Sequence, residues 1–282
     1  MTNEMKGKTV IVTGANSGIG FEACVGLAGK GAEVIMVCRN LQKGSEAMAE
    51  IKKRSGNEDI KLVLADFTSL DSVRNAANEI MAKFSKLHVL LNNAGGVIGK
   101  RTLTKDGFET TFGVNHLAPF LLTNMLLPLL KSSAPSRVVT VSSMAHLGGH
   151  MNFNDLQAEK SYTMMGAYGM SKLANILFSS ELARRMQGTQ VTSNSLHPGV
   201  VATNFGSGGG AMVKFFYRAF AFALVTPEKG AQTSIYLASS PEVEGVTGKY
   251  FIKCKEAKPS KEARDEETAK KLWDVSAQLV KL

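Results

Sequence analysis

The chain has 282 residues, of which 44% are hydrophobic and 20% are charged, and its formal net charge is +9. This composition excludes a disordered or collagen-like chain, and the length suits one large α/β domain. The excess of basic side chains leaves three classes of partner open: nucleic acid, an anionic membrane and a phosphate-bearing ligand.

Short apolar runs rich in β-branched residues alternate with longer helical patterns along the chain. Strands buried on both faces of a parallel sheet have this almost continuously apolar character. We predict strands at 9–13, 33–38, 61–64, 88–92, 137–142, 191–196 and 250–252, and helices at 18–30, 41–55, 69–84 and 114–131. The alternation predicts a doubly wound parallel α/β sheet of Rossmann type, with about seven strands and helices on both faces. Such a sheet binds ligands at the carboxyl ends of its strands.

The first strand runs directly into a glycine-rich loop, Thr-Gly-Ala-Asn-Ser-Gly-Ile-Gly, and then into a helix. Glycines at these positions allow a tight turn and let the backbone approach a pyrophosphate at the helix N-terminus. An ordinary glycine-rich turn is the alternative, but the place of the loop in the first βα unit favours a dinucleotide site. The residues expected to contact the cofactor are Gly14, Asn16, Ser17, Gly18, Ile19 and Gly20.

The second strand ends in Cys38, Arg39 and Asn40, about 20 residues after the glycine loop. An acidic residue at this position holds the ribose 2′-hydroxyl of NAD, whereas a basic residue accommodates the 2′-phosphate of NADP. Because Arg39 stands there without a carboxylate, the sequence favours NADPH over NADH, with Asn40 beside it. A solvent-exposed arginine is the alternative.

The ends of the third and fourth strands supply further candidate cofactor contacts. Asp66, followed by Phe67, could face the adenine or cap the next helix, although Ser69 is the better-placed cap. After the fourth strand, Asn93, Ala94 and Gly95 are expected to line the floor beneath the cofactor. A simple turn built from asparagine and glycine is the alternative there.

The candidate catalytic set consists of a tyrosine, a lysine, an asparagine and one of two adjacent serines. Tyr168 and Lys172 are four residues apart on a predicted helix and share a face, so the lysine cation favours the phenolate of the tyrosine. Ser142 and Ser143 end the fifth strand, and Asn115 interrupts an apolar helical pattern in which an amide needs a specific partner. The combination is far more specific than any one member.

With these motifs the chain resembles the short-chain dehydrogenase/reductase family, from about residue 8 to about residue 252. The family's glycine loop, its Asn-Asn-Ala-Gly turn, its Tyr-x-x-x-Lys pair and its Pro-Gly turn stand at 13–20, 92–95, 168–172 and 198–199. The sequences 141–146 and 171–175, and the long stretch between the serine and the tyrosine, resemble the retinol-dehydrogenase-like branch. The membrane-bound retinol dehydrogenases have an N-terminal anchor, and we expect none in this chain.

The resemblance implies a role for each member of the catalytic set. Tyr168 would be the general acid in reduction and the base in the reverse direction. Lys172 would hold the nicotinamide ribose and lower the pKa of the tyrosine. Ser143 would orient the carbonyl, with Ser142 as a less favoured substitute, and Asn115 would hold a water that links Lys172 to solvent.

The resemblance also implies where the nicotinamide and the substrate lie. Pro198, Gly199, Val201 and Thr203 are expected at the nicotinamide, and a glycine-hinged aromatic segment at about 204–226 is expected to act as a lid over the substrate. A helix packed on the core and a segment docked on a membrane are the alternatives for this segment. The candidate substrate residues are Ser143, Met144, His146, Phe205, Met212 and Phe216.

Residues 253–282 depart from the common family ending and are expected to form a charged helical extension of a domain at 1–252. Leu272, Val275 and Leu279 recur at helical spacing and predict an apolar stripe that docks on the domain or binds a partner. The helices at 114–131 and 170–186 resemble those that pair subunits in relatives, which makes a homodimer or tetramer an expectation.

The cysteines, the histidines and the apolar stretches indicate whether the protein binds a metal and in which compartment it resides. Its three cysteines are far apart and its histidines do not pair with them at ligand spacing, so we expect neither disulfides nor a metal site. No signal peptide is visible, and the apolar stretches 117–130 and 211–225 fall short of the roughly 20 residues of a spanning helix. We therefore expect a soluble cytoplasmic protein.

Together these features predict an NADPH-dependent oxidoreductase that acts on an apolar carbonyl or alcohol: a retinal, a steroid, a lipid or a xenobiotic ketone or aldehyde. The alternative is a noncatalytic NADPH-binding scaffold or redox sensor, which would not need all four catalytic residues. Nucleic-acid binding is not expected, because no recognition motif is present and the basic residues are dispersed.

Overall fold

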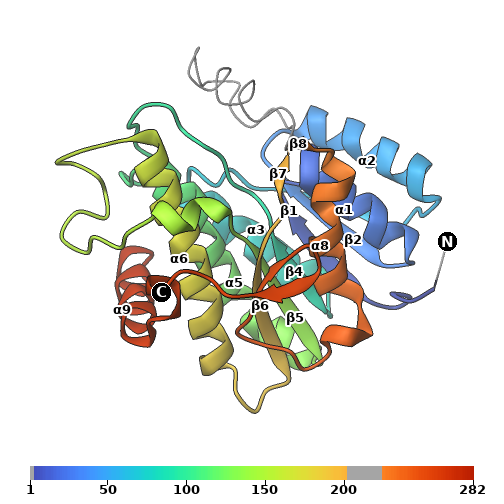
Figure 1. Cartoon of the computed structure of the whole chain (residues 1–282). Coiled ribbons are helices and arrows are strands. Elements are labelled where there is room, and N and C mark those ends of the chain that lie inside the picture. The colour runs from blue at the N-terminus through green and yellow to red at the C-terminus, as the bar shows by residue number, and fades with distance from the viewer. Residues whose placement is uncertain (1–2, 202–223) are drawn as a thin grey trace.

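The computed structural model of the chain describes residues 3–201 and 224–282 (Figure 1). An eight-stranded sheet forms its centre, in the order β10-β9-β6-β5-β4-β1-β2-β3. The strands of this sheet are β1 (Thr9–Thr13), β2 (Glu33–Cys38), β3 (Ile60–Leu64), β4 (Val89–Asn92), β5 (Ser136–Val141), β6 (Val191–His197), β9 (Tyr250–Ile252) and β10 (Lys255–Ala257). All neighbours pair in parallel except β9 and β10. Strand order reverses between β1 and β4, which places the expected binding crevice at their carboxyl ends.

Helices cover both faces of the sheet (Figure 1). One face carries α1 (Gly18–Gly29), α2 (Leu41–Ser55) and α8 (Pro227–Ser239), and the other carries α3 (Leu70–Lys83), α5 (Ala118–Ser132) and α6 (Met164–Arg185). Because the central strands bury side chains on both faces, the protein has two apolar cores, one on each side of the sheet. The predicted doubly wound α/β fold is confirmed.

The sheet has one more strand than the sequence pattern predicted. β10 is three residues long, has an exposed and charged sequence, and runs antiparallel to β9 after a tight turn. Such a strand carries no apolar run, because it lies at the edge of the sheet. A separate two-stranded parallel pair joins β7 (Val200–Val201) to β8 (Leu224–Val225).

The helix that carries Asn115 is longer and less regular than predicted. It begins with α4 (Thr110–Phe112), passes through a π-helical turn, η1 (Gly113–Leu117), and continues as α5. The whole run, Thr110–Ser132, has 23 residues and contains an 18-residue window with a mean hydropathy of 1.3, so by length and composition it could cross a membrane. This corrects the expectation that no apolar helix approaches that length. In the fold, 67% of its apolar window is buried, as in a core helix.

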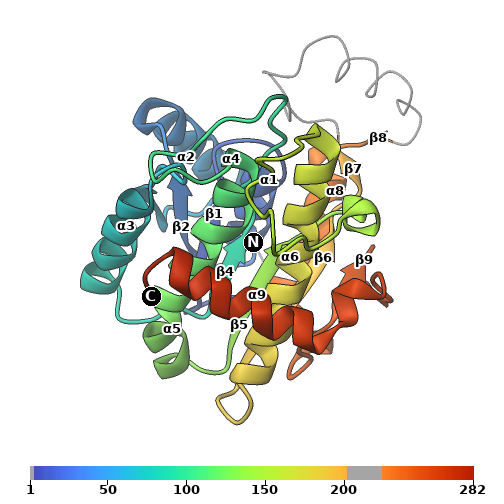
Figure 2. The ribbon, with the colours of Figure 1, turned by 90° about the vertical axis from the view of Figure 1, so that its left-hand side faces the viewer.

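The C-terminal residues are part of the packed fold. The short helix η5 (Glu262–Arg264) leads into α9 (Glu266–Leu279), which lies across α5 and α6 (Figure 2). Leu272 and Trp273 are buried, and the Trp273 ring lies 4.9 Å from that of Phe120 on α5. Val275 and Leu279 pack against the same core while partly exposed. The predicted apolar stripe therefore docks on the domain, and it covers part of the α5 and α6 surface that was expected to pair subunits.

Candidate active site

The glycine loop brings the start of α1 against the end of β1. Gly14 and Gly18 have positive φ angles of 66° and 57°, which side-chain-bearing residues rarely adopt. At Gly20 a Cβ atom would lie only 2.4 Å from both the Gly14 carbonyl oxygen and the Asn93 side-chain nitrogen. The loop therefore approaches the turn after β4 as closely as glycine allows. Asn16, Ser17 and Ile19 are at least partly accessible in this loop.

Thr13 joins the glycine loop to the Asn-Asn-Ala-Gly turn. Its hydroxyl oxygen accepts hydrogen bonds from the backbone N–H groups of Asn93, at 3.0 Å, and Ala94, at 2.9 Å. The Asn93 amide in turn donates to the Thr13 carbonyl at 2.8 Å. A tight glycine turn opening a helix at the strand-order reversal fits the pyrophosphate of a dinucleotide, which accepts hydrogen bonds from backbone N–H groups.

The end of β2 presents the predicted arginine to solvent. Arg39 is exposed, and its guanidinium makes no hydrogen bond or ion pair with the described residues. Asn40 is the N-cap of α2, because its side chain accepts a hydrogen bond from the Lys43 backbone N–H at 2.9 Å. The cap orients the turn that carries Arg39, and an arginine fork at this place suits a phosphate.

The side chains at the end of β3 are already engaged within the protein. The Asp66 carboxylate accepts hydrogen bonds from the backbone N–H and hydroxyl of Thr68, and from the Lys105 ammonium at 3.0 Å. Burial raises the pKa of the Asp66 carboxyl, but these hydrogen bonds outweigh it and lower the pKa below its usual value. Ser69 caps α3, as expected. The Phe67 side chain packs in the core, so only its backbone is available to a cofactor.

Asn115 lies in the π-helical turn and holds the chain that follows β4. Its side-chain oxygen accepts from the Gly96 N–H at 2.8 Å, and its amide donates to the Gly96 carbonyl at 2.9 Å and to the Ser171 hydroxyl at 3.0 Å. The wider turn of a π-helix re-aims a side chain, and such turns are frequent at functional sites. The buried asparagine therefore has the specific partners that its sequence position required.

Lys172 is buried on α6 beside the same turn. Its ammonium donates to the Val141 carbonyl at 3.2 Å and lies 5.6 Å from the centre of the Tyr168 ring. Burial lowers the pKa of Lys172 to about 8. A Cβ at Gly95 would lie 2.9 Å from the Asn115 side-chain oxygen and 3.5 Å from the Lys172 nitrogen, so both side chains converge on that glycine.

The two serines after β5 differ in what they contact. The Ser142 hydroxyl is buried and donates to the Lys172 carbonyl at 2.6 Å, so it is occupied by the backbone of α6. Ser143 is partly exposed, and its hydroxyl oxygen accepts from the Ala145 N–H at 3.2 Å, which starts the short helix η2 (Met144–Gly148). Of the two, Ser143 keeps a hydroxyl hydrogen for a ligand.

The predicted substrate residues differ in how accessible their side chains are. Met144 is 45% exposed, whereas His146 is 1% exposed and both of its ring nitrogens are hydrogen-bonded. The His146 side chain is therefore not available to a substrate in this structure. The remaining predicted substrate residues, Phe205, Met212 and Phe216, lie outside the described residues. Most of the expected lid also lies outside them.

The turn after β6 is described only in part. Pro198 and Gly199 follow that strand, and Gly199 has a φ of 93° with the Val225 side chain 3.0 Å from the place of a Cβ. The backbone of Val201 belongs to β7, and Thr203 lies outside the described residues. This turn is therefore positioned by β8, which follows the undescribed segment.

Two residues on α6 support the site without having been predicted to do so. The Asn175 amide donates to the same Val141 carbonyl that Lys172 contacts, at 3.1 Å, and the Ser171 hydroxyl links Asn115 to the Tyr168 carbonyl. An amide three residues after Lys172, on the same helix face, was the signal that could have identified Asn175.

The strand order and the site together define a dinucleotide-dependent dehydrogenase, and comparison with known proteins agrees. The family model described as short chain dehydrogenase matches residues 8–211, so the chain belongs to the short-chain dehydrogenase/reductase family.

Within the family the chain lies in the retinol-dehydrogenase-like branch. Retinol dehydrogenase 14 of Homo sapiens is 49% identical, over 99% of this chain and 88% of its own length, and human retinol dehydrogenase 11 is 45% identical over 100% and 88%. The crystal structure of an uncharacterized protein from Mycobacterium paratuberculosis superposes with a TM-score of 0.79 at 35% identity, over 98% of this chain and 94% of that one. The chain is thus a nicotinamide-dependent oxidoreductase of CH–OH or C=O groups, with a small-molecule substrate.

Proposed function

We propose that the protein is an NADPH-dependent oxidoreductase that interconverts apolar aldehydes or ketones and the corresponding alcohols. The observation that carries the proposal is the convergence of Asn115 and Lys172 beside Gly95, with the Tyr168 ring centre 5.6 Å from the Lys172 nitrogen. A noncatalytic dinucleotide-binding protein would not need a buried lysine next to a tyrosine.

The preference for NADPH is argued from the end of β2. Arg39 is the basic residue there, and its guanidinium makes no contact with the described protein groups that would compete for a phosphate. A 2′-phosphate offers oxygens that several guanidinium N–H groups can reach at once. The glycine loop from Gly14 to Gly20 and the Asn93–Gly95 turn would hold the rest of the dinucleotide.

A nicotinamide bound by these residues would supply the hydride that a carbonyl carbon accepts in the reduction direction. Ser143 donates a hydrogen bond to the carbonyl oxygen and orients it, and the Tyr168 hydroxyl transfers its proton to that oxygen. The Lys172 ammonium stabilises the phenolate that remains on Tyr168. Asn115 fixes the turn at Gly96 and so keeps Gly95 against Lys172. In alcohol oxidation the same groups act in reverse.

The proposed apolar substrate is supported by the surface around the site. Large apolar side chains are exposed on the two segments that carry Ser143 and Tyr168: Met144 and Leu147 on η2, at 45% and 57%, and Met165 on α6, at 46%. Burying such side chains against an apolar ligand is favourable. The relatives named above are retinol dehydrogenases, and retinol is an apolar alcohol, so retinoids belong among the proposed substrates.

The test is turnover of a carbonyl panel with each cofactor. We expect the full chain to reduce a retinal, a steroid ketone or an aliphatic aldehyde with NADPH faster than with NADH, and to leave a polar sugar carbonyl unreacted. Tyr168→Phe should lower kcat by about a hundredfold or more while retaining NADPH binding. Tyr236→Phe, which removes an exposed phenol bonded to Glu242, is the matched control.

Full activity of Tyr168→Phe would contradict the proposed mechanism. Tight binding of NADPH without turnover of any carbonyl or alcohol in the panel would favour the noncatalytic alternative instead.

A further inference from the structure

A buried histidine connects the catalytic serine to the C-terminal residues. The Nδ1 atom of His146 lies 2.7 Å from the Ser143 carbonyl oxygen, and its Nε2 atom lies 3.2 Å from the Ser260 backbone nitrogen. A backbone N–H can only donate, so Nε2 is the acceptor and carries no proton. The neutral ring therefore has its proton on Nδ1 and donates it to Ser143. Burial lowers the pKa of His146, in agreement with a neutral ring.

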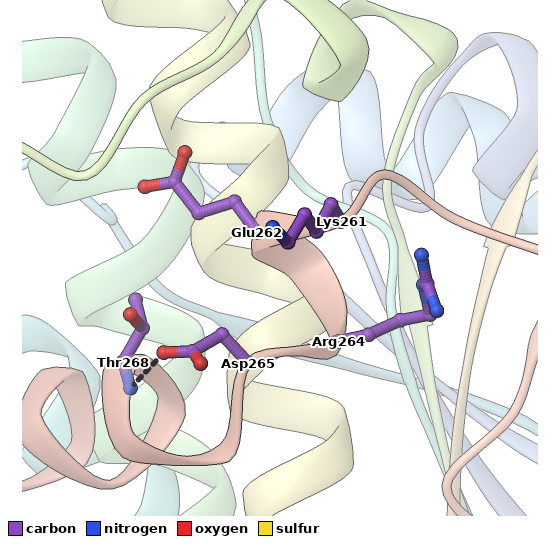
Figure 3. Close-up of a pocket in the computed structure, with 5 residues that line it drawn as sticks. All are labelled: Lys261, Glu262, Arg264, Asp265 and Thr268. Carbon is purple, nitrogen blue, oxygen red and sulfur yellow. Dashed lines mark hydrogen bonds between the residues drawn. The ribbon is translucent and has the colours of Figure 1, made fainter.

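The same C-terminal stretch holds the end of this loop through a carboxylate. One oxygen of Glu262 accepts from the Met151 backbone N–H at 2.8 Å, and the other lies 3.0 Å from the His150 Nδ1 atom. Figure 3 shows Glu262 at a surface pocket, with its carboxylate directed away from Arg264. Residues 143–151, here called the serine segment, are thus held at both ends by residues 260–262.

The turn that supplies these contacts is itself well ordered by local bonds. The Ser260 hydroxyl oxygen accepts from the Ala263 N–H at 3.2 Å, and the Ser260 carbonyl accepts from the Arg264 side chain at 3.4 Å. Ala263 is buried in the core beneath the turn. The donor at Ser260 and the carboxylate of Glu262 are therefore presented from a fixed base.

The serine segment lies directly on the helix that carries the tyrosine. A Cβ at Gly149 would be 2.4 Å from the Gly169 carbonyl oxygen, and a Cβ at Gly169 would be 2.8 Å from the Ala145 carbonyl oxygen. The backbones of the serine segment and of α6 are therefore in direct contact one residue from Tyr168. A shift of the serine segment would change the position of Ser143 relative to Tyr168.

We propose that residues 260–262 act as a clamp that positions the catalytic serine, through His146 at one end of the serine segment and Met151 at the other. The clamp lies outside residues 8–211, the part of the chain that the family model matches. This inference rests on the proposed function, because it assigns Ser143 to the substrate carbonyl.

The principal test compares Glu262→Ala and Glu262→Gln with Glu266→Gln in the full chain. Glu262→Ala removes both acceptors, whereas glutamine keeps one oxygen for the Met151 N–H. Glu266→Gln removes a charge from the first turn of α9, at an exposed residue outside the clamp. We expect Glu262→Ala to lower kcat about tenfold, since small displacements of a catalytic group are costly, with an NADPH affinity within twofold of the unaltered protein. Glu262→Gln should recover part of the loss, and Glu266→Gln should change nothing.

Amide hydrogen exchange gives a readout that does not depend on turnover. Glu262→Ala should accelerate exchange in peptides from the serine segment and leave those from β1 and α1 unchanged. Unchanged exchange would overturn the clamp, and faster exchange with an unchanged kcat would overturn its positioning role. If the unaltered chain turned over no carbonyl or alcohol, the proposed function would fail and the positioning role with it, while the exchange result would still report on the physical contact.

A pair of substitutions at His146 tests the other end. His146→Asn keeps an amide donor near the place of Nδ1 but cannot reach Ser260, and His146→Gln can accept from Ser260 but has no donor at the Nδ1 position. We expect both to lower kcat, because the link needs both bonds. A His146→Asn protein with unaltered kcat would show that the contact with Ser260 is unnecessary. Glu262 is on the surface, so its variants decide the matter if the buried histidine cannot be replaced.

Discussion

Asn115 and Gly96 exchange two hydrogen bonds, one in each direction, at 2.8 and 2.9 Å. A side chain on a helix thus pairs with the backbone of the loop after β4 in the way that a neighbouring strand would. The pairing fixes the loop where Gly95 meets Lys172. Asn115 therefore shapes the floor of the site, in addition to the expected role of holding a water.

Loss of this pairing should cost stability and activity together. Asn115→Ala leaves the Gly96 N–H and carbonyl without their partner, so we expect the free energy of unfolding to fall by about 1–3 kcal/mol, and kcat to fall with it. Urea denaturation measures the first and the carbonyl assay the second. The control is Asn124→Ala on the same helix, where one bond to the Phe120 carbonyl at 2.8 Å is lost. Equal losses in the two variants would contradict the special role of Asn115.

Substitution of Gly20 should damage the cofactor cradle. An alanine Cβ would overlap the Gly14 carbonyl oxygen, which belongs to the backbone and cannot rotate away. We expect Gly20→Ala to lower the free energy of unfolding by about 1–3 kcal/mol and to weaken dinucleotide binding, as followed by cofactor fluorescence. Gly29→Ala at the end of the same helix meets no atom within 4 Å and should be neutral or stabilising. Unimpaired binding by Gly20→Ala would show that the loop does not hold the cofactor.

The choice between the two nicotinamide cofactors should depend on Arg39. Arg39→Ala removes the hydrogen bonds that a charged donor would make to the 2′-phosphate. We therefore expect it to weaken NADPH binding about tenfold to a hundredfold. NADH, which has no 2′-phosphate, should bind the variant and the unaltered protein equally. Lys43→Ala, which removes another exposed cation from the adjacent first turn of α2, is the control. If Arg39→Ala lost the same affinity for NADPH and for NADH, Arg39 would not be the basis of an NADPH preference.

Acid should destabilise the protein through His116, which is enclosed by Phe112, Phe120 and Phe178. Burial lowers its pKa from 6.5 to about 3. Between these values the unfolded chain binds a proton that the folded protein does not, so the free energy of unfolding falls as the pH falls. The His116 contribution amounts to about 3 kcal/mol from pH 6.5 to about pH 4.

A variant without this group isolates the effect. His116→Phe should gain stability relative to the unaltered protein as the pH is lowered through this range, measured by urea denaturation at each pH. Asn124→Ala, at a residue that does not titrate, should change the free energy of unfolding by the same amount at every pH. A constant difference between His116→Phe and the unaltered protein would mean that folding does not lower the pKa of His116.

The parts of the fold that depend on local pattern could be predicted from the sequence. Apolar runs of three to six residues predicted seven strands of the central sheet, and their ends agree with the structure within one residue. Thr13, Asn93 and the glycines of the first loop could be assigned to one site because parallel strands end at the same edge of a sheet. β10 was missed because an exposed edge strand carries no such pattern.

The placement of single side chains was decided by tertiary contacts. Asp66 and His146 have the residue types of ligand contacts, yet Lys105 and Ser260, which lie far away in the sequence, already bond to them. The π-helical turn at Asn115 is likewise stabilised by hydrogen bonds across the fold, to Gly96 and Ser171.

The sequence by itself predicted the class of fold, the glycine loop and the candidate catalytic residues, because each rests on short-range periodicity or on short motifs. Only the tertiary structure decided which serine is free, what holds the loop that carries it, and how the C-terminal residues take part. Those outcomes depend on the hydrogen bonds of Ser142, His146 and Glu262 with partners on other elements, and no local pattern encodes them.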